Sequence, residues 1–481
     1  MKKLLLFLLL AYQSTLLSQT ILASYPLDLK RYDQNNYILN VEDKATNDVF
    51  VFATNTQNLT ILRYNSALFL KDEFTLSRAN LEKRSIIGYS FSPDGNPTLY
   101  WASEDSSDIW VIKYYLETKT YKILKFQYPS STEYIVAKFQ SNNLFYLLSK
   151  DVSRHTLTAY VFKNGIVEER IFDFSGFTFQ NKKTQPLSFS QIIRENPIIK
   201  IDPDDYTPLD KASKKSKIYI ENNHFILTFD HNPKETQLFD LNLENQDVIE
   251  KKIKQSETKT ARKISNSFYY EKKLYQINAN EDELLLDIRN YDSDELIKSI
   301  RITKEDTIRF KTSPLFVQQG GERQPRTLKN TKRFLQHLSS LEIGLSVYEN
   351  GTNTSMTLGG TPRVGGAYYT VMNDTFTWDY LPVVNDETVF FETALDEKSE
   401  FIGKDPAPMA LDNLYYYLNT NKKVILENVL KFNDYYILGY YDTGSKQYTM
   451  RKFTDGFPDD QMQNPIIDKA TFSKPFSFEK P

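Results

Sequence analysis

Short runs of aromatic and β-branched residues, separated by polar turns, recur along most of the chain. The pattern is clearest between Tyr89 and Phe126, where three such runs follow a tight turn. Runs of this length and composition are typical of strands that bury one or both faces of a sheet. The polar segments 104–107 and 117–120 between the runs are typical of solvated hairpin tips. This stretch therefore predicts a small antiparallel sheet.

Units of the same kind lie on both sides of this stretch. One is expected over 48–76 and one over 134–172, so the first three units repeat about every 50 residues, in the range of β-propeller blades. Further strand-rich units are expected at 218–241, 267–302, 343–393 and 423–453. We predict an all-β fold, a single β-propeller of about seven four-stranded blades with short helical insertions. Six or eight blades, and two stacked β domains divided near 310–324, are the alternatives.

The turn that opens the clearest unit reads Phe91-Ser92-Pro93-Asp94-Gly95, and the strand Leu99-Tyr100-Trp101-Ala102-Ser103 follows it. Proline presets φ at the first corner of such a turn, and glycine accepts a positive φ two positions later. This lead and strand resemble the repeat of TolB-like and WD-repeat-like β-propellers. The full motif occurs once, so the resemblance covers about one blade and implies a fold rather than a function.

Two segments break the repeat. Residues 176–216 are polar and contain prolines, and residues 311–340 combine a flexible basic loop with an amphipathic helix expected over 327–338. A second short helix is expected over 408–418, with Pro408 near its first position. We therefore expect a propeller over 24–458 with insertions at about 176–216 and 311–340, and a polar tail over 459–481. In a propeller the two ends share one blade, so residues 27–37 are expected to pair near the C-terminus.

The first residues have the order of a secretory signal peptide. Met1-Lys2-Lys3 precedes an apolar run, 4–11, which is too short to span a membrane comfortably. A signal of 1–18 is expected, with cleavage between residues 18 and 23. The lysine, asparagine, isoleucine and tyrosine bias is that of a bacterium with an AT-rich genome. We expect a secreted, periplasmic or outer-membrane-associated protein, with no transmembrane segment after the signal.

The net charge limits the partners that the chain can bind, and the absence of cysteine limits the bonds and metal sites that it can form. The chain has 59 basic and 62 acidic residues and a net charge of -3, so no overall field favours nucleic acid. There is no cysteine, which excludes disulfides, thiolate zinc sites and a lipoprotein anchor. Stability must therefore come from the core.

Few residues carry recognisable chemistry. The four histidines show no metal-ligand spacing, and neither a Gly-x-Ser-x-Gly elbow nor a Walker-type loop is present. We expect no cofactor. Asp202, Asp204, Asp205 and Asp210 offer the oxygen ligands that Ca²⁺ prefers, but without EF-hand spacing, so a solvated loop is the main interpretation.

The densest positive patch lies on the second insertion, where functional surfaces tend to occur. It comprises Arg323, Arg326, Lys329, Lys332 and Arg333. The leading hypothesis is a monomeric, non-catalytic scaffold that binds a protein or glycan of the envelope or exterior. The alternative is a carbohydrate-active enzyme, a glycoside hydrolase or lyase, with carboxylates of the central funnel as acid and base. An enzyme should show several Asp, Glu, Tyr, His or Arg side chains that converge in one deep pocket and have perturbed pKa values. A scaffold should show a plugged or apolar channel and a patch on one face.

Overall fold

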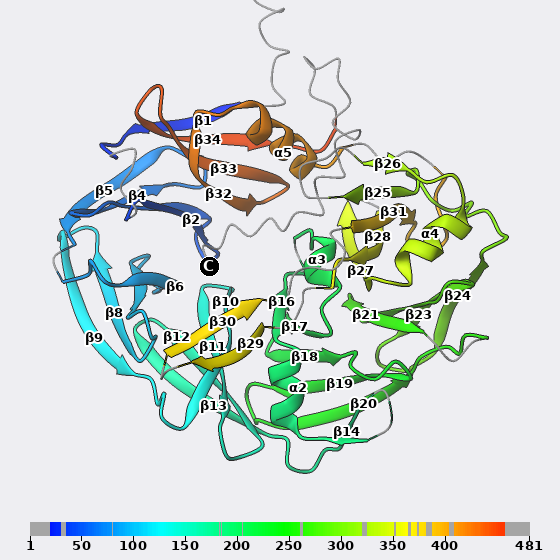
Figure 1. Ribbon diagram of the computed structural model, residues 1–481. Coiled ribbons are helices and arrows are strands. Elements are labelled where there is room, and N and C mark those ends of the chain that lie inside the picture. The colour runs from blue at the N-terminus through cyan, green and yellow to red at the C-terminus, as the bar shows by residue number, and fades with distance from the viewer. Residues whose placement is uncertain are drawn as a thin grey trace, which may run out of the picture.

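Seven sheets stand around a common centre in the computed structural model (Figure 1). The structure describes residues 20–29, 35–78, 80–181, 183, 185–203, 205–259, 263–319, 325–350, 353–363, 367–372, 375–380, 387–403 and 408–456. In most blades the strands follow one another from the inside of the ring to its rim. The expected signal peptide and the tail 459–481 lie outside the described residues.

Blades 1 to 3 are simple four-stranded antiparallel sheets. Blade 1 is β2 (Tyr37–Asp43), β3 (Asp48–Thr54), β4 (Asn58–Tyr64) and β5 (Leu70–Ser77). Blade 2 is β6 (Ser85–Phe91), β7 (Pro97–Ala102), β8 (Asp108–Tyr115) and β9 (Thr120–Gln127). Blade 3 is β10 (Glu133–Ser141), β11 (Leu144–Asp151), β12 (Thr156–Lys163) and β13 (Ile166–Asp173).

Blades 4 and 6 depart from this scheme in their strand number or order, whereas blade 5 keeps it. Blade 4 adds a parallel inner strand, β16 (Ile198–Ile201), to β17 (Ser216–Glu221), β18 (His224–Phe229), β19 (Glu235–Asn242) and β20 (Val248–Lys254). Blade 5 is β21 (Ile264–Tyr270), β22 (Lys273–Ala279), β23 (Glu283–Asn290) and β24 (Leu296–Thr303). Blade 6 has the order β26 (Arg326–Thr327), β25 (Phe316–Gln319), β31 (Glu387–Leu395), β28 (Asn353–Thr361) and β27 (Glu342–Asn350).

Blade 7 joins the two ends of the described chain. It is built from β32 (Val424–Phe432), β33 (Tyr435–Asp442) and β34 (Gln447–Phe453), and β1 (Ile21–Pro26) adds the outer strand. β1 runs antiparallel to β34, with Tyr25 opposite Tyr448. A shared blade was expected, but with residues 27–37. That range is wrong because Leu27 and Leu29 are buried in the core between blades 7 and 1.

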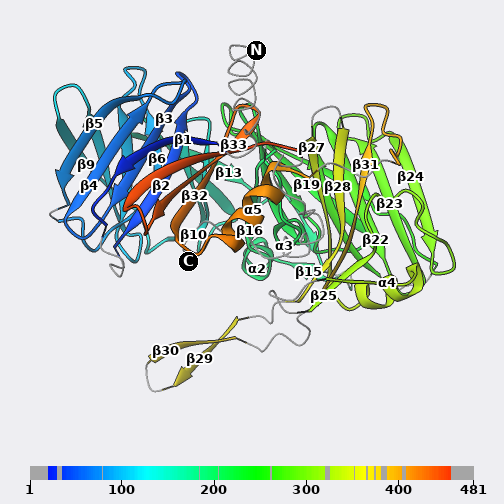
Figure 2. The ribbon, with the colours of Figure 1, turned by 90° about the horizontal axis from the view of Figure 1, so that it is seen from above.

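Four helices and two short hairpins complete the described elements. The helices are α2 (Phe189–Glu195), α3 (Leu209–Ala212), α4 (Thr331–Leu338) and α5 (Ala410–Thr420), and the hairpins are β14 (Phe179–Gln180) with β15 (Pro186–Leu187) and β29 (Ala367–Met372) with β30 (Thr375–Tyr380). Figure 2 shows the β29–β30 hairpin projecting from the ring. No helix among the described residues is long and apolar enough to cross a membrane.

The prediction of an all-β propeller is confirmed, and the seven sheets agree with the expected number. Strand β7 shows why the pattern of residues along the sequence predicts this fold. Neighbouring residues of a strand point to opposite faces. Tyr100 accordingly packs in the core between blades 2 and 3, and Trp101 packs in the core between blades 1 and 2. Gly95 has a φ of 71°, the positive value that the turn requires.

Clusters of buried apolar side chains join most pairs of neighbouring blades. Separate clusters join blades 1 and 2, blades 2 and 3, and blades 3 and 4. A large cluster spans blades 4, 5 and 6, and another joins blades 7 and 1. None of the clusters formed by described residues contains side chains of both blade 6 and blade 7. We call the junction of these two blades the polar seam.

Removing β1 tests the closure of the ring. A chain that begins at Tyr25 lacks most of the strand that pairs with β34. We expect its free energy of unfolding to fall by about 3 kcal/mol relative to a chain that begins at Thr20, since roughly three lost backbone hydrogen bonds contribute about 1 kcal/mol each. Denaturant unfolding followed by circular dichroism measures the difference. Equal stability of the two chains would show that β1 does not close the ring.

Candidate functional site

The segment between blades 3 and 4 returns to the inside of the ring. β16 lies beside β17, and α3 packs against β27 and β28 of blade 6. Glycine permits this approach, because a Cβ on Gly344 would lie 2.7 Å from the Cα of Ser213. The hydroxyls of Ser213 and Thr361 are 2.8 Å apart across the same contact. The first insertion is therefore packed structure rather than a free loop.

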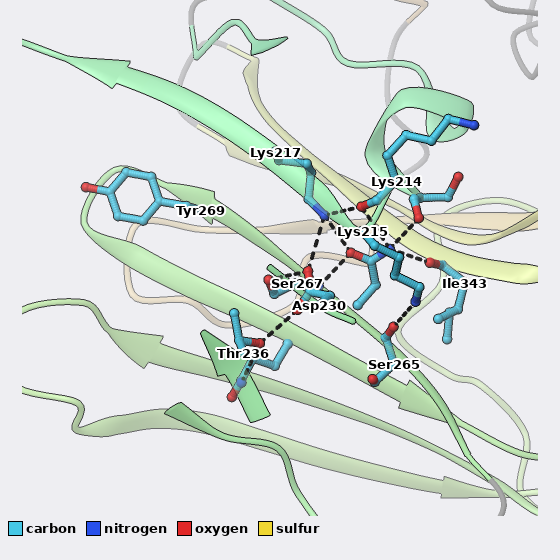
Figure 3. Close-up of polar contacts among 12 residues, drawn as sticks. Lys214, Lys215, Lys217, Asp230, Thr236, Ser265, Ser267, Tyr269 and Ile343 are labelled. Atoms are coloured by element: carbon cyan, nitrogen blue, oxygen red, sulfur yellow. Dashed lines mark hydrogen bonds and ion pairs between the residues drawn. The ribbon is translucent and has the colours of Figure 1, made fainter. Parts of the chain in front are cut away.

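A buried ion pair holds this packing in place (Figure 3). Lys217 and Asp230 are both fully buried, with Nζ and Oδ2 3.3 Å apart. Lys217 Nζ also donates to Asn266 Oδ1 at 2.7 Å and to the Lys214 carbonyl at 2.6 Å. Asp230 accepts hydrogen bonds from the Thr236 hydroxyl, at 2.9 Å, and from the backbone and hydroxyl of Ser267.

Asn266 extends this network to three parts of the ring. From blade 5, its side-chain amide donates to the Ser213 carbonyl at 2.6 Å and to the Ile343 carbonyl at 2.7 Å. Burial lowers the pKa of Lys217 to about 8, although the charge of Asp230 opposes the shift. Because both ions are shielded from solvent, the network joins α3 to blades 4, 5 and 6 rather than binding a ligand.

A second polar group lies at the polar seam. Tyr436 on β33 donates its hydroxyl to Asp205 Oδ1 at 2.6 Å, which ties the first insertion to blade 7. Lys431 on β32 donates to the Tyr348 hydroxyl on β27 at 3.1 Å, which ties blade 7 to blade 6. The Tyr206 ring meets the Tyr348 ring edge-on, with centroids 6.4 Å apart. We call these five residues the seam site.

Two residues of the seam site, Asp205 and Tyr436, have raised pKa values. Burial raises the pKa of Asp205, the charge of Asp202 raises it further, and the Tyr436 hydrogen bond opposes the rise. Burial and the neighbouring Asp205 also raise the pKa of Tyr436. Asp202 is 47% exposed and forms an ion pair with Lys200 on β16. The arrangement can donate and accept hydrogen bonds at the inner edge of the ring.

The predicted calcium ligands do not gather into a metal site in the described part of the chain. Asp204 lies outside it. Asp202 faces Lys200 and Asp205 accepts from Tyr436, so both carboxylates have protein partners. Asp210 lies in α3, and burial raises its pKa. No group of three or more potential ligands is found among the described residues.

The predicted basic patch is displayed on the outside of blade 6. Arg323 lies outside the described residues. Arg326 on β26, Lys329 just before α4, and Lys332 and Arg333 in the first turn of α4 are all exposed, and we call these four the basic surface. Within the described residues, none of the four lies within 4 Å of a carboxylate.

Local sequence explains how these cations are presented. The helix was expected over 327–338 but begins at Thr331, because Arg326 and Thr327 pair with β25 and the Asn330 side chain caps the helix at the Arg333 amide. Three apolar side chains bury the inner face of α4: Phe334, Leu335 and Leu338. Lys332 and Arg333 therefore stand on a firmly anchored helix.

The histidines are not gathered into one site. His155 is exposed. His224 and His337 place Nδ1 2.5 Å from Asp240 and 2.6 Å from Glu387, respectively. His231 lies against Phe179 and Phe229, and burial lowers its pKa to about 4.

Neither the seam site nor the buried pair was predicted from the sequence. Lys217 occurs in a run of lysines that resembles a solvated lead into a strand, and only its place on β17 buries it. Tyr348 and Tyr436 are two of 32 tyrosines, so composition cannot select them. Their partners lie far away in sequence, and strand alternation alone does not show which strands face each other.

Comparisons with known proteins were made at the level of sequence and of structure. No protein-family model matches the chain, and no curated protein matches it. Among solved structures, the WD40 domain of SCAP from fission yeast is 9% identical, with a TM-score of 0.29, over 90% of this chain and 87% of that chain. The β-propeller domain of the Trilobed protease from Pyrococcus furiosus is 10% identical, with a TM-score of 0.33, over 90% and 98%.

A third similar structure is the complex of the fission yeast SREBP–SCAP binding domains, at 11% identity and a TM-score of 0.31, over 74% of this chain and 87% of that chain. The assignment of a β-propeller rests on the seven sheets and their closure. The narrower resemblance of the Phe91–Gly95 motif to TolB-like propellers stays a prediction.

The buried ion pair leads to a prediction on stability. Asp230→Asn leaves the Lys217 ammonium without its counter-ion in a buried place. We expect the free energy of unfolding to fall by about 3–5 kcal/mol, the usual effect of breaking a buried pair. The double variant Lys217→Met/Asp230→Asn should lose less than Asp230→Asn alone, because it removes the uncompensated charge.

Urea unfolding of the wild type, both single variants and the double variant measures these effects. Lys71→Met, at an exposed lysine on β5, is the matched control and should change stability by less than about 0.5 kcal/mol. A double variant that loses the sum of the two single losses would contradict the coupling between Lys217 and Asp230.

Proposed function

We propose that this protein is a secreted, non-catalytic β-propeller that binds an anionic partner through the basic surface of blade 6. The observation that carries the proposal is a set of four exposed cations without a carboxylate neighbour in the described structure. Elsewhere in the ring arginines such as Arg63, Arg84 and Arg301 each pair with a carboxylate. A cluster left uncompensated attracts negative charge from outside.

The surroundings strengthen this reading of the basic surface. The segment 309–333 contains seven basic residues and one acidic residue, although the whole chain carries a net charge of -3. The local charge therefore differs in sign from the average. Because α4 is anchored by three buried apolar residues, binding would cost little ordering of the backbone. An acidic protein surface or an acidic glycan has the matching charge.

Secretion is supported by the sequence alone. The order Met1-Lys2-Lys3 followed by apolar residues 4–11 is that of a signal peptide. A cut after Ser18 leaves β1 whole, whereas a cut after Ala23 removes half of it. The pairing of β1 with β34 therefore favours the earlier position. A partner of the cell envelope or the exterior follows from this localisation.

Charge reversal tests the binding proposal. In one variant the four cations of the basic surface are changed to glutamate. In a control, four exposed lysines of blades 1, 2, 3 and 7 are changed to glutamate instead: Lys71, Lys83, Lys163 and Lys422. Both variants carry a net charge of -11, which is -3 less 8. They differ only in where the charge is placed.

Retention on heparin and on immobilised polyglutamate, at several salt concentrations, provides the measurement. We expect the basic-surface variant to elute at clearly lower salt than the wild type and to lose most of the salt dependence of binding. The control should remain close to the wild type. Equal losses in the two variants would show that only net charge matters and would contradict the proposed surface.

A second candidate function, cleavage of glycosides, is favoured by one observation. Burial raises the pKa of Asp205, and the nearby Asp202 forms an ion pair with Lys200. Two neighbouring carboxyl groups in unlike environments are an arrangement that glycoside cleavage uses. Activity on a panel of polysaccharides, with Asp202→Asn and Asp205→Asn as variants, tests it. Activity that both variants abolish would favour the enzyme over the scaffold.

A further inference from the structure

The outer strand of blade 2, β9, is unusually open to solvent. Seven of its eight residues are exposed, more than on the outer strand of any other blade described. Three of these are large apolar side chains: Tyr121 is 52% exposed, Leu124 47% and Ile123 39%. Its inner edge pairs with β8, and its outer edge pairs with no strand in the described structure. Unpaired backbone of this kind is a template for a further strand.

Regular geometry distinguishes β9 from several other edges. Its ladder with β8 runs without a register shift from Asp108 opposite Gln127 to Tyr115 opposite Thr120. The outer strands β1, β5 and β24 each have such a shift in their ladders. Bulges bend an edge away from a new partner, so a regular edge is the better receptor.

The charges of β9 are uncompensated and of one sign. Lys122 and Lys125 stand on opposite faces of the strand, and neither pairs with a carboxylate in the parts of the chain described. The strand itself carries no acidic residue. The comparable outer strands each contain residues of both signs and an ion pair: β13 pairs Arg170 with Glu168, and β20 pairs Lys252 with Glu250. Lys125 instead lies 4.9 Å from the centre of the Trp110 ring.

We propose that β9 receives an extended segment of a partner protein as a fifth strand of blade 2. The backbone edge supplies the hydrogen bonds, and the exposed apolar residues supply contacts on both faces. The lysines select a segment with carboxylates three residues apart, separated by apolar residues. An antiparallel strand places such carboxylates opposite Lys122 and Lys125, where opposite charges stabilise the pairing.

A second copy of this chain fits the edge less well. Two antiparallel copies of β9 bring four lysines and no carboxylate into one pair of strands. Registers centred on Lys122 or on Lys125 set a lysine directly opposite its own copy, which is destabilising. The remaining registers leave all four charges without a counter-ion. The charges therefore favour a different, acidic chain.

The probe is a labelled peptide, acetyl-Thr-Val-Glu-Val-Ile-Glu-Val-Thr-amide, titrated with the whole protein and followed by fluorescence anisotropy. Paired from its first residue with Gln127, it sets its glutamates opposite Lys125 and Lys122. We expect Lys122→Glu/Lys125→Glu to weaken its binding about tenfold or more. The same variant should bind the peptide with lysines in place of glutamates more tightly than the wild type does. Both lysines are exposed, so the variant is expected to fold, which circular dichroism checks.

Backbone pairing needs a readout that charge alone would not change. Two peptides N-methylated at alternating residues serve this purpose, since only every second N–H of an antiparallel strand points to its neighbour. One should lose binding and the other should retain it. Equal behaviour of the two methylated peptides, or no exchange of preference in the charge-reversed variant, would overturn the proposal.

Two further controls separate this site from the alternatives. The variant with four glutamates at the basic surface should keep the peptide affinity of the wild type, so failure of the function proposed above and failure of this site are distinguishable. Sedimentation velocity tests the other occupant. A dimer that Ile123→Lys dissociates would show that a second copy covers β9 and would contradict an acidic partner segment.

Discussion

The whole ring depends on the backbone pairing between β1 and β34. These strands come from opposite ends of the described chain, and their ladder completes the blade that closes six successive blades and a three-stranded sheet into a circle. The apolar residues between blades 7 and 1 reinforce the ladder, with Leu27 and Leu29 packed beside Tyr448 and Met450. On this side blade 7 is held by both hydrogen bonds and a core.

The other side of blade 7 is held differently. At the polar seam the described links to blade 6 and to the first insertion are hydrogen bonds, from Lys431 to Tyr348 and from Tyr436 to Asp205. The helix α5 covers the facing side of blade 7 with Ala410 and Leu414. Polar contacts contribute less net free energy than a buried apolar face, because their groups also bond well to water. The polar seam is thus a weaker junction than the one between blades 7 and 1.

The first insertion strengthens this part of the ring from within. Asn266 and the Lys217–Asp230 pair fix α3 against blades 4, 5 and 6, so the insertion reaches the seam from a firm base. The second insertion lies on the outside of the ring, where it carries the basic surface. The two segments that interrupt the repeat therefore differ in their roles. The first insertion packs inside the ring, and the second carries exposed positive charge on its outside.

Much of this fold could be predicted because alternation along a strand is a local property. The pair Tyr100 and Trp101 shows on sequence alone that both faces of β7 are buried, as the structure bears out. The exposure of the basic residues could be expected in the same way, since a cluster of charges is visible in the sequence itself. The order of blade 6 was not, because β25 pairs with β31 across more than 60 residues. The seam site likewise joins residues 205, 348 and 436, which only the closed ring brings together.

The most direct test of this account is the hydrogen exchange of backbone amides, followed by mass spectrometry on the intact chain. Strands of a unit that opens first exchange together and early. If blade 7 shares an apolar core with a neighbouring blade on one side only, β32, β33, β34 and β1 should exchange as a group before the strands of blade 5, which lies between two apolar junctions. Exchange of blade 7 as late as blade 5 would contradict a weak polar seam.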